Sequence, residues 1–539
     1  MKNKLLLVLL ISSVILTFNL GSWGVLETSE ARYAEISREM LVSKDYLHPT
    51  LLNIRHYHKP PTTYFITVLG YRLFGINEFG ARFFLQVAIL LQMILIYHIT
   101  LILYKKKDLA LMATLIYFSL PLVLISSRNL TTDAYLNTFI LAAIWAWLSY
   151  KTKPKASWHL YLFYLFLALG FETKGPVVLI FPLVFIIAYK VILKDKISKN
   201  KHHFFGLVLF FIVASLWYLL LYAENRNLLD YFLNKQLADR IATNSFKRAK
   251  PFWYYLAFIP LAALPWSAII VYNVKTYVKN SLKTRSLKLV LTVTILVCLL
   301  IFSAFKTKLI LYLLPIFGFI AIIAAKIVSE SSKQQRRIYN NILLGLIAIF
   351  LITLMVINSF RTPIHFDFYT AAVLSLLTLI CIILIYRFAK SIQKTAILGY
   401  VFGALLVIAG NYILTINQDE LNSAKHALTY IEKNLETVEN IAIYNYLIVS
   451  TPYYSQKPVF TLNNGHYTVE RETQFEEQEN WKKTLIDVRS EWGKHKADSL
   501  IDANTAILAR KRDALPDYLK KAFNNKLRMK YFGKWVIYY

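Results

Sequence analysis

The chain has few charged residues and few cysteines for its length. Only 17% of its 539 residues are charged, whereas 57% are hydrophobic, more than the core of a soluble protein requires. The two cysteines, Cys298 and Cys381, both lie inside apolar runs, which excludes a disulfide framework and a cysteine-based zinc site. The sequence shows neither a phosphate-binding glycine loop nor the internal repeat typical of transporters. This composition predicts a membrane protein.

Acidic residues are also scarce, with 31 Asp and Glu against 61 Lys and Arg, a formal net charge of +30. Nucleic-acid binding does not explain this balance well, because the basic residues form short clusters between apolar runs. Runs of that length cross a bilayer as helices, and we expect about thirteen of them in an all-α polytopic fold. The expected spans are 5–20, 82–104, 109–126, 134–150, 158–171, 175–193, 203–222, 253–274, 287–304, 308–328, 338–357, 369–388 and 395–416.

The basic clusters predict the orientation of the chain. If the N-terminus is cytoplasmic, every second connection carries a cluster, as the positive-inside rule requires. A cleaved signal peptide at 5–20 is the alternative, but no clear small-residue cleavage site follows it. We therefore expect a multi-pass protein of the bacterial inner membrane. The clusters lie at residues 105–107, 151–155, 194–201, 275–288, 333–337 and 387–394.

The connections on the other side carry charges of both signs. The longest is the segment 21–81, within an expected transmembrane domain of residues 1–416. Charges of both signs on one face of a helix bundle predict a polar cavity, because anchoring needs only basic residues. The charged residues on this side include Glu27, Glu30, Arg32, Lys59, Arg128, Asp133, Glu172, Lys174, Asp239, Arg240, Lys247, Arg248, Lys306 and Lys308.

Residues 417–539 are more polar and predict a small α/β domain on the periplasmic side. Short alternating runs at 440–445 and 505–510 are typical of strands. Helical patterns lie near 419–435 and 515–524. Without a recognisable catalytic motif, we expect this domain to be a lid or a docking surface for the acceptor.

The first outer connection contains carboxylates at the start of a helical pattern. The pattern runs from Leu26 to Leu41, with Glu27, Ser29 and Glu30 at its beginning. Helix capping and the helix dipole explain these residues structurally. The functional alternative is that one carboxylate acts as general base for an acceptor hydroxyl.

Lys59 stands before the proline pair in NIRHYHKPPTTYF. Proline starts helices, and a lysine at this depth can simply reach the lipid headgroups. The alternative is a contact to a lipid-linked phosphate, whose charge an ammonium group would neutralise. Asp133 stands just before an expected span, where a helix cap is the structural explanation. Three further lysines run against the positive-inside bias and favour an anionic ligand on the outer face: Lys174, Lys306 and Lys308.

Several strings together resemble a known family. EARYAEISREML, KPP, YRLFGINEFGARF, ETKGP, PFWYY and LPW occur in this order. They are similar to the bacterial lipid A aminoarabinose transferases and their protein mannosyltransferase relatives, over most of residues 1–330. The resemblance implies the C-type glycosyltransferase fold with a periplasmic C-terminal domain. It also implies transfer of a sugar from a polyprenyl phosphate outside the cytoplasmic membrane.

The resemblance implies a catalytic carboxylate near the string that begins at Glu30. In the aminoarabinose transferases an Asp-Glu pair stands here, and the Asp position is Ser29 in this chain. Glu30 keeps the Glu, and Glu27 lies where some relatives carry their acid. The catalytic assignment is therefore divided between Glu27 and Glu30, with Arg32 and Tyr33 expected to contact substrate.

The resemblance also implies cationic contacts to the donor phosphate. Lys59 and Arg240 match family positions that hold the lipid phosphate, and Lys174, Lys306 and Lys308 match further basic positions. Asp133 matches an acidic position that binds the sugar or orients Lys59. The family's zinc ligands are not matched, because His58 and Leu237 occupy their places. No cofactor is firmly predicted, and a divalent metal is the open alternative.

The reaction that the resemblance implies is an inverting displacement. An acceptor oxygen attacks the anomeric carbon while polyprenyl phosphate departs, with one carboxylate, Lys59 and Arg240 as the minimal set. The acceptor is lipid A, another glycolipid or a protein hydroxyl. The rival classes are a transporter or flippase of a lipid-linked saccharide and a non-catalytic scaffold.

Overall fold

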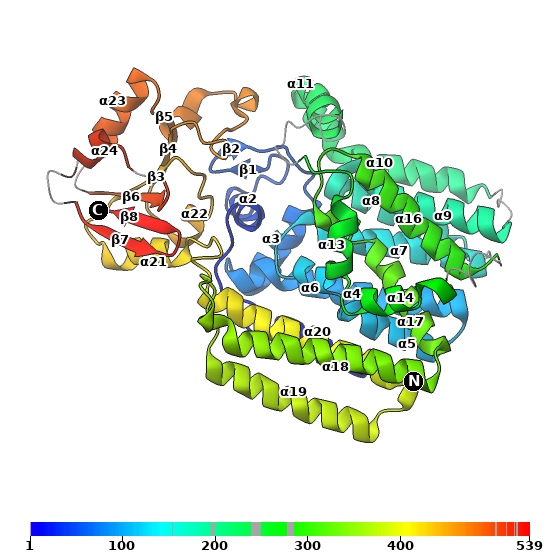
Figure 1. The fold of residues 1–539 in the computed structure, drawn as a ribbon. Helices are drawn as coiled ribbons and strands as arrows, with labels where there is room; N and C mark the ends of the chain where they lie inside the picture. The colour runs from blue at the N-terminus through cyan, green and yellow to red at the C-terminus, as the bar shows by residue number, and fades with distance from the viewer. Residues whose placement is uncertain are drawn as a thin grey trace.

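The computed structural model describes residues 2–153, 155–195, 200–238, 249–277, 285–501, 504–513, 515–521, 523 and 527–539. Long helices lie against one another in a bundle, and a smaller α/β region at the C-terminal end of the chain lies beside it (Figure 1). Between the two, the view shows helix α2 and a short β-hairpin from the first outer connection.

The bundle contains helices that fit a bilayer. In the described part of the chain, seven helical stretches are long and apolar enough to cross a membrane, and a pair bent by 108° raises the number to eight. The seven are α4 (Glu78–Tyr104), α8 to α9 (Trp158–Leu193), α10 (His202–Glu224), α16 (Leu287–Ala304), α18 with the short helix after it (Lys333–Ser359), α19 (Phe368–Phe388) and α20 (Ser391–Ile416). The bent pair is α13 (Tyr254–Ala262) and α14 (Trp266–Tyr272).

The remaining expected spans coincide with helices that are shorter or more polar. One of them is divided, because Pro121 cannot continue the helix before it. The protein is therefore a largely helical, multi-pass membrane protein, and the number of thirteen spans stays a prediction. These helices are α1 (Lys2–Thr17), α5 (Lys107–Phe118), α6 (Pro121–Ser126), α7 (Thr132–Thr152) and α17 (Ile316–Glu330).

The outer faces of the bundle expose large apolar side chains. On α19, for example, Val373, Leu376, Leu379 and Ile383 are all more than half exposed. A soluble protein rarely leaves so continuous an apolar surface uncovered, whereas lipid tails cover it without cost. The interior of the bundle is apolar as well, with a core cluster that α4, α5, α7, α9 and α17 share.

The first outer connection, which is the segment 21–81, folds into a compact unit between the bundle and the C-terminal region (Figure 1). The helix expected between Leu26 and Leu41 is α2 (Ser29–Ser43), whose inner face buries Ala31, Ala34, Ile36 and Met40. After α2 come the hairpin strands β1 (Thr50–Leu51) and β2 (Ile54–Arg55), and then α3 (Thr62–Phe74).

The C-terminal region contains a six-stranded sheet in the order β5-β4-β3-β6-β8-β7. The first four strands in this order run parallel, and the last two pairings are antiparallel. The strands expected at 440–445 and 505–510 correspond to β3 and β6. The elements are α21 (Lys425–Asn434), β3 (Asn440–Tyr444), α22 (Thr451–Tyr454), β4 (Val459–Asn463), β5 (Leu485–Asp487), α23 (Glu491–Leu500), β6 (Thr505–Arg510), α24 (Asp517–Lys521), β7 (Met529–Phe532) and β8 (Trp535–Tyr538).

Candidate active site

A cavity of about 670 Å³ opens among the helices on the side of the first outer connection. Its walls are mainly aromatic and aliphatic, and three charged side chains from helix ends reach it: Lys59 before α3, Asp133 in the first turn of α7, and Lys174 in the last turn of α8. An apolar space with a few charged groups suits an amphiphile that has a hydrocarbon tail and an anionic head. The aromatic walls include Phe171, Phe210, Phe211, Phe232, Phe302 and Phe305.

Asp133 and Lys174 form an ion pair inside this cavity. Lys174 Nζ lies 2.5 Å from Asp133 Oδ1, and the two side chains are only 11% and 9% exposed. The same ammonium lies 4.5 Å from the centre of the Tyr312 ring. A partly buried ammonium is held here by a carboxylate and an aromatic face, and an anionic ligand would find it already oriented. The N-cap position of α7 is Thr131, so Asp133 is not the helix cap that was the structural alternative, and its carboxylate pairs with Lys174.

Lys59 reaches the cavity because the proline pair fixes the start of the next helix. Pro61 is the N-cap of α3, so Lys59 lies just outside the first turn. Tyr57, His58 and Pro60 line the same cavity as Lys59. The whole KPP step is therefore part of the cavity wall.

The structure does not bring Lys306 and Lys308 to the cavity wall. In the segment that follows α16, Phe305 and Thr307 line the cavity, and alternate side chains of an extended segment point to opposite sides. Lys306 is exposed. Lys308 is buried and donates to the backbone oxygen atoms of Lys250 (2.9 Å) and Phe305. Their roles in substrate binding stay predictions.

Glu30 lies in a buried ion pair with Arg82. Arg82 Nε and Nη2 each donate to the carboxylate at 2.8 Å, and both side chains are fully buried. The backbone amides of Leu26 (3.0 Å) and Leu130 (3.2 Å) donate to it as well. With four donors, this carboxylate holds the start of α2 against α4. Glu30 does not line the cavity.

Glu27 faces the C-terminal region. Its carboxylate accepts hydrogen bonds from the backbone amides of Ser450 (2.9 Å) and Val449 (3.3 Å). Burial raises the pKa of Glu27 to about 7, although these amides favour the charged form. Glu27 is not among the cavity residues either, so neither carboxylate expected from the sequence lines it. Asp133 is the carboxylate among the described residues of the cavity wall.

Arg32 lies in a cluster of basic side chains beside the cavity. Burial, together with the charges of His58, Arg32, Arg471 and Lys59, places the pKa of His56 well below its usual value. The rings of His56 and His58 are 4.0 Å apart, and Arg32 Nε is buried with no hydrogen-bond partner among the described residues. This concentration of positive charge favours an anion next to Lys59. Beside it, Tyr33 packs on Tyr64 at a ring distance of 5.7 Å.

Sequence reasoning missed Glu472, which the C-terminal region brings to the edge of the cavity. Glu472 Oε2 lies 2.8 Å from His58 Nε2 and accepts a hydrogen bond from the Tyr231 hydroxyl at 2.5 Å. Its other oxygen lies 3.0 Å from Lys235 Nζ. Burial alone would raise the pKa of Glu472, but these partners hold it at about 2. No sequence signal marked this residue, because it lies in a polar stretch without periodicity.

The contacts of Glu472 connect three parts of the site. His58 is the residue before Lys59, and Tyr231 and Lys235 belong to the helical turn Tyr231–Ala238, which contributes Phe232, Leu233 and Gln236 to the cavity wall. The C-terminal region therefore holds two walls of the cavity through one carboxylate.

One predicted phosphate-binding residue and three neighbouring charged residues fall on a segment outside the described residues. Arg240 lies outside the described residues, as do Asp239, Lys247 and Arg248. In the described part of the chain, no group of three or more His, Cys, Asp or Glu side chains is arranged to hold a metal ion. Among the described residues, the carboxylate of Glu472 lies within ion-pair distance of His58.

The helix bundle defines a polytopic membrane protein, and the lining of its cavity suits an amphiphile that carries an anionic head. Residues 3–230 match the family model described as dolichyl-phosphate-mannose-protein mannosyltransferase. This match, and the relatives described next, confirm the family resemblance that the sequence motifs indicate.

The relatives include undecaprenyl phosphate-alpha-4-amino-4-deoxy-L-arabinose arabinosyl transferases. The enzyme of Wigglesworthia glossinidia brevipalpis is 30% identical over 58% of this chain and 56% of its own length. A second such enzyme, from Proteus mirabilis, is 29% identical over 68% of each chain. The match thus spans between about half and two thirds of these relatives.

The fold is also that of a solved structure. The crystal structure of ArnT from Cupriavidus metallidurans bound to undecaprenyl phosphate aligns with a TM-score of 0.79. The alignment covers 99% of this chain and 98% of that one at 18% sequence identity. The two proteins therefore share a fold, including the C-terminal region.

Proposed function

We propose that this protein transfers a monosaccharide from a polyprenyl-phosphate donor to an acceptor at the periplasmic face of the bacterial inner membrane. The observation that carries the proposal is the cavity itself, with aromatic walls for a prenyl chain and Lys59 and Lys174 for its phosphate. The names of the relatives, which are arabinosyl transferases that use an undecaprenyl phosphate sugar, support the same reaction class.

The reaction follows from the charges at the polar part of the cavity. The acceptor oxygen attacks the anomeric carbon from the face opposite the phosphate, and the bond between that carbon and the phosphate oxygen breaks. The electron pair stays on the departing polyprenyl phosphate, whose added negative charge Lys59 and Lys174 stabilise. The configuration of the sugar is inverted, and no protonation of the leaving group is needed. Arg240 remains a predicted third cation.

The proton of the acceptor hydroxyl passes to a carboxylate. Asp133 is favoured by position, because a phosphate that takes Lys174 as its partner leaves the Asp133 carboxylate able to accept a proton. Between the two carboxylates expected from the sequence, Glu27 suits a base better, since a pKa of about 7 lies near the working pH. To act as the base, Glu30 would have to give up its hydrogen bonds from four donors. Arg32 and Tyr33 are proposed to orient the donor head group.

We further propose the topology that the charge pattern predicts. The N-terminus lies in the cytoplasm, and the first outer connection and residues 417–539 lie in the periplasm. Residues 1–416 form the transmembrane domain, with the catalytic loop at 21–81. This arrangement places the acceptor, which is lipid A, another glycolipid or a protein, on the side of the cavity from which Lys59 and Asp133 enter.

A transporter or flippase of a lipid-linked saccharide is not favoured. Transporters place their charged sites near the middle of the membrane between repeated halves. Here Lys59, Asp133 and Lys174 stand at helix ends, and the sequence shows no repeat.

The test is mass spectrometry of lipid A and of periplasmic glycoproteins from a host strain with and without the gene. The deletion should remove one defined sugar, and the wild-type gene should restore it. Lys59→Ala and Asp133→Asn should not restore it, whereas Lys433→Ala, which changes an exposed lysine outside the cavity wall, should. Parallel Glu27→Gln and Glu30→Gln strains assign the base. An unchanged glycan profile in the deletion strain would contradict the proposal.

A further inference from the structure

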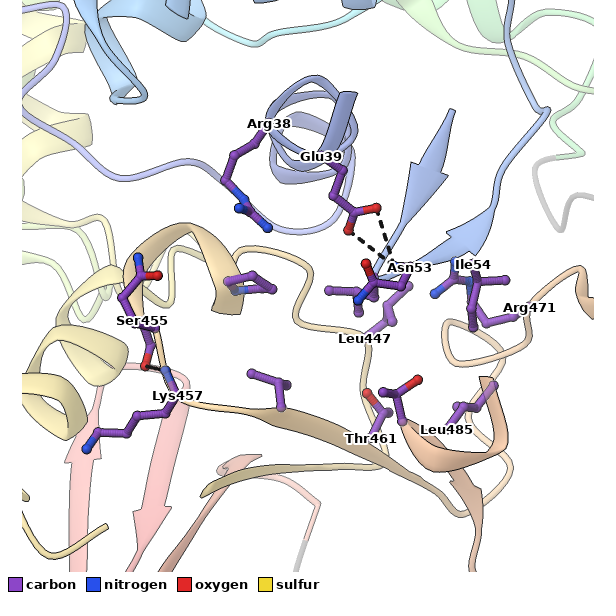
Figure 2. A pocket seen from close by; sticks show the side chains of 15 residues that line it. Arg38, Glu39, Asn53, Ile54, Leu447, Ser455, Lys457, Thr461, Arg471 and Leu485 are labelled. Atoms are coloured by element: carbon purple, nitrogen blue, oxygen red, sulfur yellow. Dashed lines mark hydrogen bonds between the residues drawn. The ribbon is translucent and has the colours of Figure 1, made fainter. Parts of the chain in front are cut away.

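A second cavity of about 260 Å³ lies between the first outer connection and the C-terminal region. Helix α2 covers one side, the β1–β2 hairpin another, and the segments around α22, β4 and β5 form the rest (Figure 2). It shares no lining residue with the larger cavity. We therefore expect its ligand to differ from the lipid tail that is proposed to fill the larger cavity.

The wall of this second cavity is polar and carries an excess of positive charge. Its charged residues are three cations, Arg38, Lys457 and Arg471, against one carboxylate, Glu39. The carboxylate of Glu39 faces the backbone amide of Asn53, with both oxygen atoms at 3.3 Å. The neutral polar side chains are Asn53, Ser455, Gln456, Thr461 and Thr484. Such a surface suits a ligand with hydroxyl groups and at least one negative charge.

Arg471 is the strongest indication of an anion. Its Nη2 atom donates to the backbone oxygen of Leu51 at 2.5 Å, and no carboxylate among the described residues lies within ion-pair distance of it. Burial lowers the pKa of Arg471 to about 10, although the charges of Glu39, Glu476 and Glu472 act in the opposite direction. A guanidinium group has five N–H donors in a planar fork that matches phosphate or carboxylate oxygens.

Arg38 adds a second guanidinium group to the wall. Its Nε and Nη2 atoms donate to Glu35 at 2.8 and 2.7 Å, which fixes the side chain and directs the group. Figure 2 shows Arg38 and Glu39 extending from α2 toward the cavity, while Arg471 lies on another side. Lys457 differs, because its ammonium group is bound to the backbone oxygen of Val438.

The second cavity is connected to the active site through the chain itself. Arg471 precedes Glu472, and Glu472 contacts His58, the residue before Lys59. The two cavities therefore share a wall segment, with Arg471 on the second cavity and the next residue, Glu472, bound to the segment before Lys59.

We propose that the second cavity binds the head group of the acceptor through a phosphorylated saccharide, with Arg471 and Arg38 contacting the phosphate. The word acceptor rests on the proposed function, whereas the binding of a sugar phosphate does not. A single site of this size holds one sugar ring with its phosphate.

The experiment is isothermal titration calorimetry of glucose 1-phosphate against the purified full-length protein in detergent. Undecaprenyl phosphate is present at saturation, so that the larger cavity is filled. We expect binding at one site, binding of unphosphorylated glucose that is at least about tenfold weaker, and a loss of affinity of at least about tenfold in Arg471→Gln. Arg38→Gln should also weaken binding. Arg489→Gln, which removes an exposed guanidinium group outside the cavity wall, is the matched control, and its affinity should stay within about twofold of wild type.

Other outcomes would overturn the proposal. They are an absence of glucose 1-phosphate binding, an unchanged affinity in a folded Arg471→Gln protein, or equal binding of glucose. Loss of binding in Lys59→Ala would also do so, because the sugar phosphate would then occupy the lipid-phosphate site. Correct folding of each variant is checked by the shift of its unfolding temperature on addition of undecaprenyl phosphate.

The calorimetry needs no donor sugar, so the two proposals fail separately. Binding at Arg471 without any transfer activity would contradict the proposed function, but the second cavity would still be a binding site for a sugar phosphate. Transfer activity without binding at Arg471 would support the proposed function and contradict the proposal for the second cavity.

Discussion

Single residues at the edge of the larger cavity show how the charges of the site are held. Glu472 provides a negative charge to His58, Tyr231 and Lys235, and Asp133 provides one to Lys174. Both carboxylates are partly desolvated together with their cationic partners, and pairing offsets the cost of that desolvation. In the proposed reaction, the donor phosphate takes the place of Asp133 beside Lys174.

Glu472→Gln tests this arrangement. Because the pKa of Glu472 is about 2, the carboxylate is charged throughout the physiological range, and glutamine removes that charge while keeping the size. Charged hydrogen bonds of this kind contribute about 1.5–3 kcal/mol, so we expect at least about a tenfold loss of kcat/KM. The loss should appear mainly in KM for the donor, since Glu472 holds the wall and does not touch the reacting atoms.

Glu477→Gln is the control for that change. Glu477 also pairs with the first outer connection, through Arg55 at 2.8 Å, but it is 78% exposed, and exposed pairs contribute little. The activity of Glu477→Gln should therefore stay close to that of the wild type. Equal losses in the two variants would contradict a specific role for Glu472. The depressed pKa also means that the stabilisation by Glu472 is full above about pH 5 and is lost as the pH falls toward about 2.

Individual elements were predictable from the sequence to different degrees. The apolar runs predicted the positions of the helices, because a bilayer imposes both length and composition. Helix α2 and strands β3 and β6 were also predictable from their periodicity. The short strands β4, β5, β7 and β8 were not predicted, because three to five residues in a polar region give too weak a pattern.

The candidate site was predicted only in part. Lys59, Asp133 and Lys174 were marked by their position at span ends, and the structure brings all three to one cavity. Glu30 has the same sequence signal, but Arg82 binds it in the core. Contacts between residues more than 400 positions apart, such as His58 with Glu472, leave no trace in a single sequence.

Glu27 connects two elements, the start of α2 and the turn before α22. Its pKa is raised to about 7 by burial, so the folded state prefers the protonated form. The stability contribution is therefore greatest below the unfolded pKa of about 4.3 and is lost as the pH rises to about 7. We expect the unfolding temperature of the wild type to fall more between pH 5 and pH 8 than that of Glu27→Gln.

Thermal unfolding of both proteins in the same detergent measures this difference. Glu420→Gln, which changes a carboxylate in the adjacent loop for which no hydrogen bond to α2 is found in the described residues, is the matched control. Parallel curves for wild type and Glu27→Gln would contradict the assignment of the pH dependence to Glu27.

At the scale of the whole molecule, the fold places a polar α/β region on one side of an apolar helix bundle (Figure 1). A reporter enzyme that is active only in the periplasm should be active when it is fused after Tyr539. The same reporter should be inactive when it is inserted at Lys106, inside a basic cluster. Activity at Lys106 and none at Tyr539 would reverse the proposed orientation and place the cavity opening in the cytoplasm.

The proposed function requires the larger cavity to hold a polyprenyl phosphate by its phosphate group. Native mass spectrometry of the purified protein with undecaprenyl phosphate tests this for wild type, Lys59→Ala, Lys174→Ala and the exposed-lysine control Lys433→Ala. We expect one bound lipid in wild type and Lys433→Ala, and at least about tenfold weaker binding in the other two variants. Equal retention of the lipid by all four proteins would contradict the proposed function.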